Sequence, residues 1–175
     1  MASLRSSRAA LIEHIEGTSE AKKHMKLAGF KRQRSSGHML DILAKIAGQA
    51  PGNKLSIPLP QWLTDAQAHR QACERDRGIY ARILRLVARM SGTREQRKAE
   101  LLVSLLDKHA LVLAFDSRPI TLSYLADSIA AHAQVQTIIA TGDPSSKRQL
   151  LLQTFAPGSA ATGVIGLCSD SLAKV

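Results

Sequence analysis

The sequence predicts an α/β fold built around a parallel sheet. Three short apolar runs, at 110–115, 135–139 and 162–168, alternate with two helical patterns toward the end of the chain. A succession of strand, helix, strand, helix and strand is typical of parallel strands joined by crossover helices. Each run ends in small polar residues, and ligands of such sheets bind beside the carboxyl ends of the strands. We therefore expect the functional residues in the turns that follow the three strands.

Residues 1–92 predict a mainly helical, basic region. Ser6 or Ser7 caps a first helix that stops at Gly17, because glycine commonly follows the last helical residue. Apolar residues recur at helical spacing in three further segments, which are 19–28, 38–47 and 64–90. Polar, glycine- and proline-containing stretches separate these segments.

The longest of these helices begins near Asp65, where a carboxylate complements the helix dipole. Its later half has one apolar stripe at helical spacing, formed by Ile79, Ile83, Val87 and Met90. Another stripe is basic and consists of Arg75, Arg82, Arg85 and Arg89. Such a stripe is either a solvated helix face or a surface that contacts nucleic acid.

Residues 93–175 predict the α/β region. A helix over 94–106 leads into the first strand, and the crossover helices span 120–131 and 144–155. Right-handed crossovers place all three strand ends at one edge of the sheet. Phe115 and Phe155 are predicted to lie in the core.

Positive charge is concentrated in the first part of the chain. Residues 1–109 hold 20 Lys and Arg against 10 Asp and Glu, whereas residues 110–175 hold 4 of each kind. A field of one sign attracts polyanions, of which nucleic acid is the most common in a cell. The helical region is therefore expected to bear the basic partner surface, if the charge does more than maintain solubility.

Composition favours a cytoplasmic protein. No apolar run approaches the roughly 20 residues of a membrane helix, and the start of the chain does not resemble a signal peptide. Only two cysteines occur, Cys73 and Cys168, and they predict neither a disulfide framework nor a zinc site. The six histidines show no metal-ligand spacing.

Short motifs of the α/β region follow one another in the order Phe115-Asp116-Ser117, Thr141-Gly142, Arg148, Phe155-Ala156-Pro157-Gly158 and Ser169-Asp170-Ser171-Leu172-Ala173. This succession resembles the second RecA-like domain of superfamily-two helicases, in particular the Swi/Snf-type DNA translocases. Leu4–Leu11 is similar to the segment that joins the two motor domains of those ATPases, and Arg94–Leu106 is similar to the helix that leads into the second domain. Residues 93–175 would then be the N-terminal part of a RecA-like helicase C-terminal domain.

The resemblance implies contacts to the sugar-phosphate backbone of duplex DNA. Small residues at strand ends let phosphates approach backbone amides and hydroxyls, and basic residues release counterions. The positions that match are Ser117, Arg118, Thr141, Gly142, Lys147, Ser169 and Ser171, and the basic helix adds Arg82, Arg85 and Arg89.

The departures from the family imply that this chain is not catalytic alone. A Gly-rich lysine loop and a paired-acid strand end, which hold ATP and Mg²⁺ in the first motor domain, do not occur here. The chain ends within the motif that begins at Ser169, before the family's arginine finger. We expect part of a motor whose partners are DNA and the first motor domain, with ATP and Mg²⁺ bound only by the intact motor. An exposed sheet edge further predicts a homodimer.

Other interpretations of the same residues stay open. The chain is alternatively a stand-alone adaptor whose basic helices dock an acidic protein, or, ranked last, a small enzyme on a flavodoxin-like frame that lacks a cofactor motif. Asp116 and Asp170 are more readily turn formers than catalytic acids. Thr141-Gly142 holds a phosphate or only permits a tight turn. Ser169 lacks the glycine-flanked elbow of a nucleophile.

Overall fold

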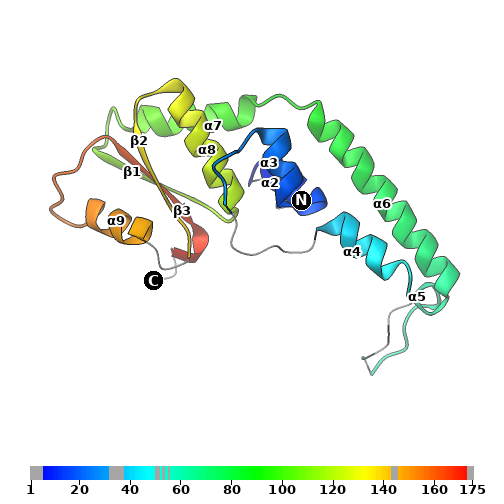
Figure 1. Cartoon of the computed structure of the whole chain (residues 1–175). Coiled ribbons are helices and arrows are strands. Elements are labelled where there is room, and N and C mark those ends of the chain that lie inside the picture. Colours follow the sequence, from blue (N-terminus) through cyan, green and yellow to red (C-terminus); the bar gives the residue numbers. More distant parts are fainter. Residues whose placement is uncertain are drawn as a thin grey trace. The chain divides into compact units, whose positions relative to one another are not determined.

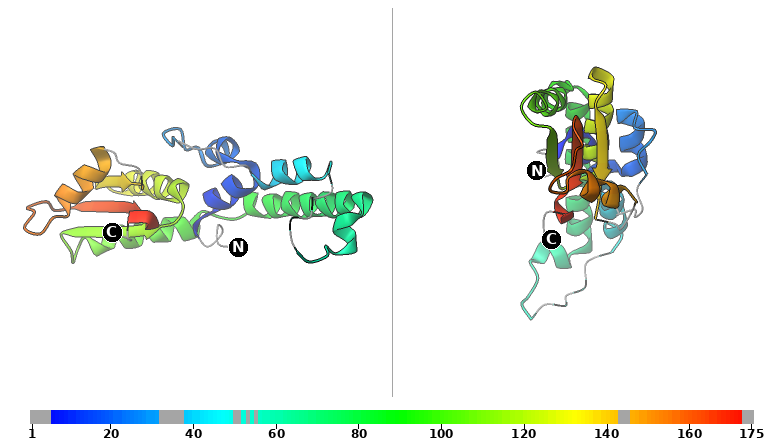
Figure 2. Two further views of the ribbon diagram at one scale, coloured as in Figure 1. Left: turned by 90° about the horizontal axis from the view of Figure 1, so that it is seen from below. Right: turned by 90° about the vertical axis from the view of Figure 1, so that its left-hand side faces the viewer.

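Three parallel strands form the sheet of this protein. The computed structural model describes residues 6–31, 38–49, 52, 54, 56–142 and 146–172. Its strands are β1 (Leu111–Asp116), β2 (Gln136–Ala140) and β3 (Val164–Ser169). The strand order is β1-β3-β2, so the last strand lies in the middle (Figures 1 and 2). The predicted α/β fold, with three parallel strands and crossover helices, is confirmed, and the arrangement is consistent with part of a RecA-like sheet.

Helices pack on both faces of the sheet. The crossovers are α8 (Pro119–His132) and α9 (Ser146–Thr154), and α7 (Thr93–Leu105) precedes β1. Pro119 suits the first turn of α8 because that turn needs no donor from its nitrogen. One face of β3 packs with α7 and α8 through Ile165 and Leu167. The opposite face packs with α9 through Val164, Cys168 and the helix residue Leu151.

Gly166 lies at the centre of β3 and makes room for α9. A Cβ atom at this position would lie 2.5 Å from Leu113 Cδ2, 2.8 Å from Leu151 Cδ1 and 3.2 Å from Phe155 Cε2. Glycine leaves space for all three neighbours in their present positions, and any side chain here would require them to move.

Phe115 is not a core residue, and that prediction is wrong. Its side chain is 49% exposed, and Leu113 on the same face of β1 is 44% exposed. β1 is an edge strand, and α9 packs against β2 rather than β1. Phe155, by contrast, packs against the cluster beneath α9.

The helical region contains α2 (Arg8–Glu16), α3 (Thr18–Met25), α4 (Met39–Ile46), α5 (Gln61–Thr64) and α6 (Ala66–Ala88). Gly17 follows α2 with φ of 98°, as expected for a helix stop. Asp65 caps α6 by accepting hydrogen bonds from Gln67 N at 2.8 Å and Ala68 N at 3.1 Å. α4 packs along α6.

The chain divides into two compact units. One holds the sheet and consists of Met1–Leu11, Lys22–Lys31 and Ser91–Val175, as far as these are described. The other consists of Ile12–Ala21 and Arg32–Met90, within the same limits. Their boundary at Met90 and Ser91 lies next to the one predicted after residue 92, but two earlier segments belong to the unit that holds the sheet. None of the helices in the described part of the chain has the length and apolar character of a membrane-spanning segment.

Candidate nucleic-acid interface

The carboxyl ends of all three strands meet at one edge of the sheet, as predicted. In the register, Asp116 of β1 is opposite Ser169 of β3, and Ala140 of β2 is opposite Cys168. Thr141 therefore lies at the level of Asp116 and Ser169, and Ser117 follows one residue further on, at the level of Asp170. Parallel pairing brings residues that are far apart in sequence into one row. We call this row, with the residues that follow it, the carboxyl edge.

The corners after β2 and β3 lie against each other. Ser171 Oγ is 2.6 Å from the place that a Cβ of Gly142 would occupy, so a side chain at Gly142 would require the Ser171 hydroxyl to move. Ser169 Oγ and Ser171 Oγ are 2.6 Å apart and share a hydrogen bond. Ser169 is buried and its hydroxyl is occupied by this bond, whereas Ser171 and Gly142 are exposed and Thr141 is half-buried. Among these four residues, Ser171 and Gly142 face solvent most openly.

The corner after β1 is shaped by Asp116. Its Oδ1 accepts a hydrogen bond from Arg118 N at 2.8 Å and another from Ser6 Oγ. The interpretation of Asp116 as a turn former therefore agrees with its contacts. Ser117 is exposed, and Arg118 is half-buried at the N-cap of α8. This corner offers an exposed hydroxyl beside a guanidinium.

Lys147 adds a positive charge near the same edge. It is exposed in the first turn of α9, and that turn begins four residues after Gly142. Five residues of extended chain span at most about 18 Å, so Lys147 stays within that distance of the β2 corner. Arg148 follows it in the same turn.

Cys168 is a buried, unreactive thiol. The side chain is 0% exposed, and desolvation raises its pKa above the ordinary value. A nucleophilic cysteine needs a lowered pKa and access, and this residue has neither.

We expect Cys168 to resist alkylation in the folded protein at neutral pH and to react once urea unfolds it, as measured by mass spectrometry. Because the raised pKa belongs to the folded state, its contribution to stability is complete below the ordinary thiol pKa. It is lost as the pH rises through the folded value. Rapid alkylation without unfolding would contradict this assignment.

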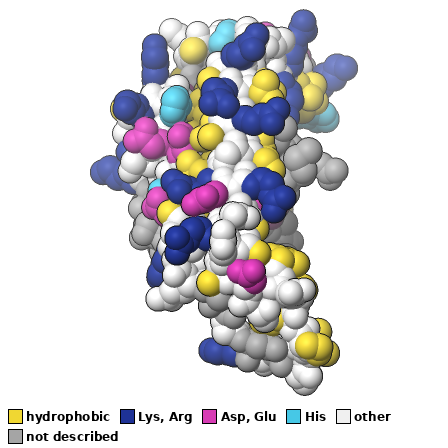
Figure 3. Space-filling view, turned by 90° about the vertical axis from the view of Figure 1, so that its right-hand side faces the viewer, with side chains coloured by type: hydrophobic (Ala, Val, Ile, Leu, Met, Phe, Trp, Pro, Cys, Tyr) yellow, Lys and Arg dark blue, Asp and Glu magenta, His cyan; other side chains and the backbone are white. Residues whose placement is uncertain are grey.

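The predicted arginine stripe is exposed along α6 and at its C-cap, Arg89. Arg82, Arg85 and Arg89 are all exposed, and no carboxylate in the described part of the chain pairs with them. No acidic residue occurs between Arg77 and Arg94. Lys and Arg side chains are prominent, with apolar side chains between them, in the view of Figure 3.

The predicted apolar stripe of α6 is only partly buried. Val87 is buried, but Ile79 is 48% exposed and Met90 is 40% exposed. Leu86, which lies outside that stripe and beside the arginines, is 62% exposed. His69 and Cys73 are buried instead.

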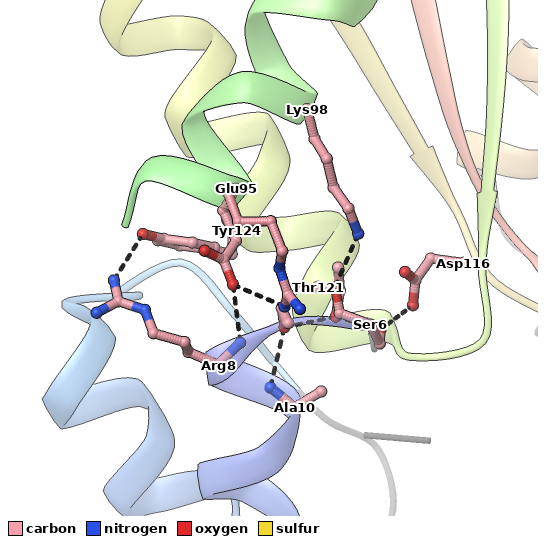
Figure 4. A network of polar contacts seen from close by, with 10 residues as sticks. Ser6, Arg8, Ala10, Glu95, Lys98, Asp116, Thr121 and Tyr124 are labelled. Atoms are coloured by element: carbon pink, nitrogen blue, oxygen red, sulfur yellow. Dashed lines mark hydrogen bonds and ion pairs between the residues drawn. The ribbon is translucent and has the colours of Figure 1, made fainter. Parts of the chain in front are cut away.

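Sequence reasoning missed a buried polar network in the unit that holds the sheet (Figure 4). Thr121 Oγ1 lies 2.8 Å from Ser6 Oγ and 2.7 Å from Ser7 Oγ. Ser7 Oγ also accepts from Ala10 N at 3.0 Å, which confirms the predicted serine cap of α2. The contacts join residues more than 100 positions apart in the chain, so no local pattern indicates them.

Glu95 anchors the other side of this network. Its carboxylate is 1% exposed and accepts from Arg8 N at 3.0 Å and from Arg94 Nη2 at 3.1 Å. Lys98 Nζ donates to Ser6 O at 2.9 Å. Arg8 also reaches the Tyr124 hydroxyl at 3.4 Å (Figure 4). Thus the start of α2 and the residues before it pack against α7.

No family model, curated protein or solved structure matches the chain.

Proposed function

We propose that this chain is part of the second motor domain of a helicase-like, DNA-dependent ATPase of the cytoplasm. In this role it contacts the sugar-phosphate backbone of DNA and does not catalyse a reaction alone. The observation that carries the proposal is the convergence of three corners rich in small polar residues at the carboxyl edge. Ligands of open parallel sheets bind at such an edge.

The exposed groups at this edge suit a phosphate backbone. Ser117 supplies a hydroxyl donor, Ser171 supplies another when Ser169 donates the bond that they share, and Gly142 lets a phosphate come close to the main chain. Arg118 and Lys147 add positive charge. Each phosphate that they neutralise steepens the slope of log K against log salt by about 0.9. Small side chains of this kind let the DNA backbone approach the protein main chain, and they do not select a base sequence.

The arginine stripe of α6 is a second, independent surface for the same polyanion. Its members need not be oriented for a particular base, because a field of one sign attracts any nucleic acid. We propose that this surface raises the affinity for DNA without adding sequence specificity.

The residues of the carboxyl edge do not suit ATP and Mg²⁺ by themselves. Asp116 is occupied by Arg118 and Ser6, which leaves Asp170 as the exposed carboxylate after the described strand ends. A magnesium-nucleotide site needs a phosphate-cradling loop in addition. We expect no ATP turnover when the chain is mixed with ATP, Mg²⁺ and DNA, whereas steady phosphate release by the pure protein would refute this.

Binding to a random-sequence duplex tests the proposal directly. We expect affinity to fall as salt rises, and the Arg118→Ala, Lys147→Ala double variant to lower the slope of log K against log salt by about 1.8. A double variant that removes the same charge elsewhere, Arg97→Ala with Lys108→Ala, should leave the slope nearly unchanged. If both double variants lower the salt slope equally, net charge alone drives binding and the carboxyl edge is not the site.

The adaptor remains a second candidate because Leu86 is exposed among unpaired arginines on α6. An acidic amphipathic helix would match that combination of charge and apolar surface. Affinity for duplex DNA that does not change with salt would favour the adaptor over the motor.

We also propose that two copies associate through β1. This strand is an edge of the sheet and exposes Leu113 and Phe115. An unprotected edge of this kind pairs readily with another strand. Sedimentation velocity should show a dimer that increases with protein concentration, and Phe115→Lys should abolish it. A monomer over the whole concentration range would remove the proposal.

A further inference from the structure

The buried hydroxyls beside β1 form a chain of hydrogen bonds with a single direction. Ala10 N–H is only a donor, and it reaches Ser7 Oγ at 3.0 Å. At the other end, Ser6 Oγ donates to Asp116 Oδ1. Between these ends stand the contacts from Ser7 to Thr121, at 2.7 Å, and from Thr121 to Ser6, at 2.8 Å.

The two ends determine which atom donates at each step. Each hydroxyl has one proton, so Ser6, which gives its proton to Asp116, must accept from Thr121. Thr121 has then used its proton and must accept from Ser7. The donors therefore all point the same way: Ala10 N donates to Ser7, Ser7 to Thr121, Thr121 to Ser6, and Ser6 to Asp116. Hydrogen bonds aligned in this way polarise one another and strengthen the last bond.

The chain ends on the carboxylate that shapes the β1 corner. The same oxygen, Asp116 Oδ1, accepts from Arg118 N at 2.8 Å. We propose that Ser6, Ser7 and Thr121 are positioning residues, which hold Asp116 so that Ser117 and Arg118 present their groups at the carboxyl edge. The effect on DNA binding rests on the proposed function, whereas the effect on the corner does not.

The network can be broken without releasing the segment that carries the serines. Arg8 N and Lys98 Nζ hold that segment through bonds to Glu95 and to Ser6 O. Thr121 is fully buried, and valine has nearly its shape without the hydroxyl. Thr121→Val therefore removes both middle bonds and leaves the anchors in place, and Thr121→Ser retains the hydroxyl.

Amide hydrogen exchange of Arg118 in the free protein tests the proposal. We expect exchange to be about fivefold faster in Thr121→Val and in Ser6→Ala, as for the loss of one ordinary hydrogen bond. In Thr121→Ser it should stay near the wild-type rate. Ser128→Ala serves as control because it removes a hydroxyl of α8 that bonds Tyr124 O, outside the network. Unchanged exchange at Arg118 in both Thr121→Val and Ser6→Ala would overturn the proposal.

A second readout separates this proposal from the proposed function. If the edge binds DNA, Thr121→Val should weaken duplex binding severalfold although it removes no charge, and Thr121→Ser should restore it. Faster Arg118 exchange without any salt-dependent DNA binding by the wild type would uphold the positioning role and refute the motor function. DNA binding that Thr121→Val leaves intact despite faster exchange would refute the link between corner and ligand.

Discussion

Replacing Gly166 with valine is expected to lower the free energy of unfolding by about 1–3 kcal/mol. A side chain here meets the ends of Leu113, Leu151 and Phe155, which come from β1, α9 and the turn after it, so these side chains must move. Valine adds two methyl groups beyond the first contact and therefore requires a larger shift than alanine. The gain in strand propensity is too small to offset this.

Urea unfolding followed by circular dichroism measures the change. Gly29→Ala is the matched control, because it lies in the same unit and a Cβ there meets nothing within 4 Å. Gly166→Ala should fall between the control and Gly166→Val. A Gly166→Val variant that unfolds at the wild-type urea concentration would show that α9 does not pack on the centre of the sheet.

Neutralising the arginine stripe is expected to give the largest loss of DNA affinity. A triple variant of Arg82, Arg85 and Arg89 to glutamine should lower the salt slope by about 2.7 if each contacts one phosphate. At roughly 1 kcal/mol for each exposed charge pair, affinity at low salt should fall about a hundredfold. Fluorescence anisotropy with a labelled random duplex measures both quantities.

A charge-matched triple variant of the same unit provides the control. Arg70 and Arg77 project about a quarter turn or more away from the middle of the stripe on α6, and Lys45 is exposed on α4. With these three changed to glutamine, the protein has the same net charge as the stripe variant. If both triple variants lose affinity equally, the stripe is an ordinary solvated face.

The strands could be predicted because each is a short apolar run between turn residues, whereas their order could not. Hydrophobic pattern specifies that a segment is a buried strand but not which strand pairs with it. The burial of β3 on both faces agrees with its central position, yet β1 has a similar composition and lies at the edge. For this reason the prediction that Phe115 lies in the core is wrong.

The candidate site was predictable in outline and not in detail. Parallel pairing brings Ser117, Thr141 and Ser169 to one edge whatever the strand order. The ends of the strands, which the sequence indicates, are therefore enough to predict that these residues share an edge. Which hydroxyls face solvent depends on contacts across the chain, such as the bond that occupies Ser169. The role of Thr121 likewise cannot be predicted from local sequence, because its partners Ser6 and Ser7 lie at the start of the chain.

Amide hydrogen exchange measured with and without a short duplex at low salt shows whether DNA binds at the carboxyl edge. We expect slower exchange at its three corners, in peptides that contain Ser117 and Arg118, Thr141 and Gly142, and Ser169 to Ser171. Protection confined to other parts of the chain, with all three corners exchanging as fast as in the free protein, would contradict binding at this edge.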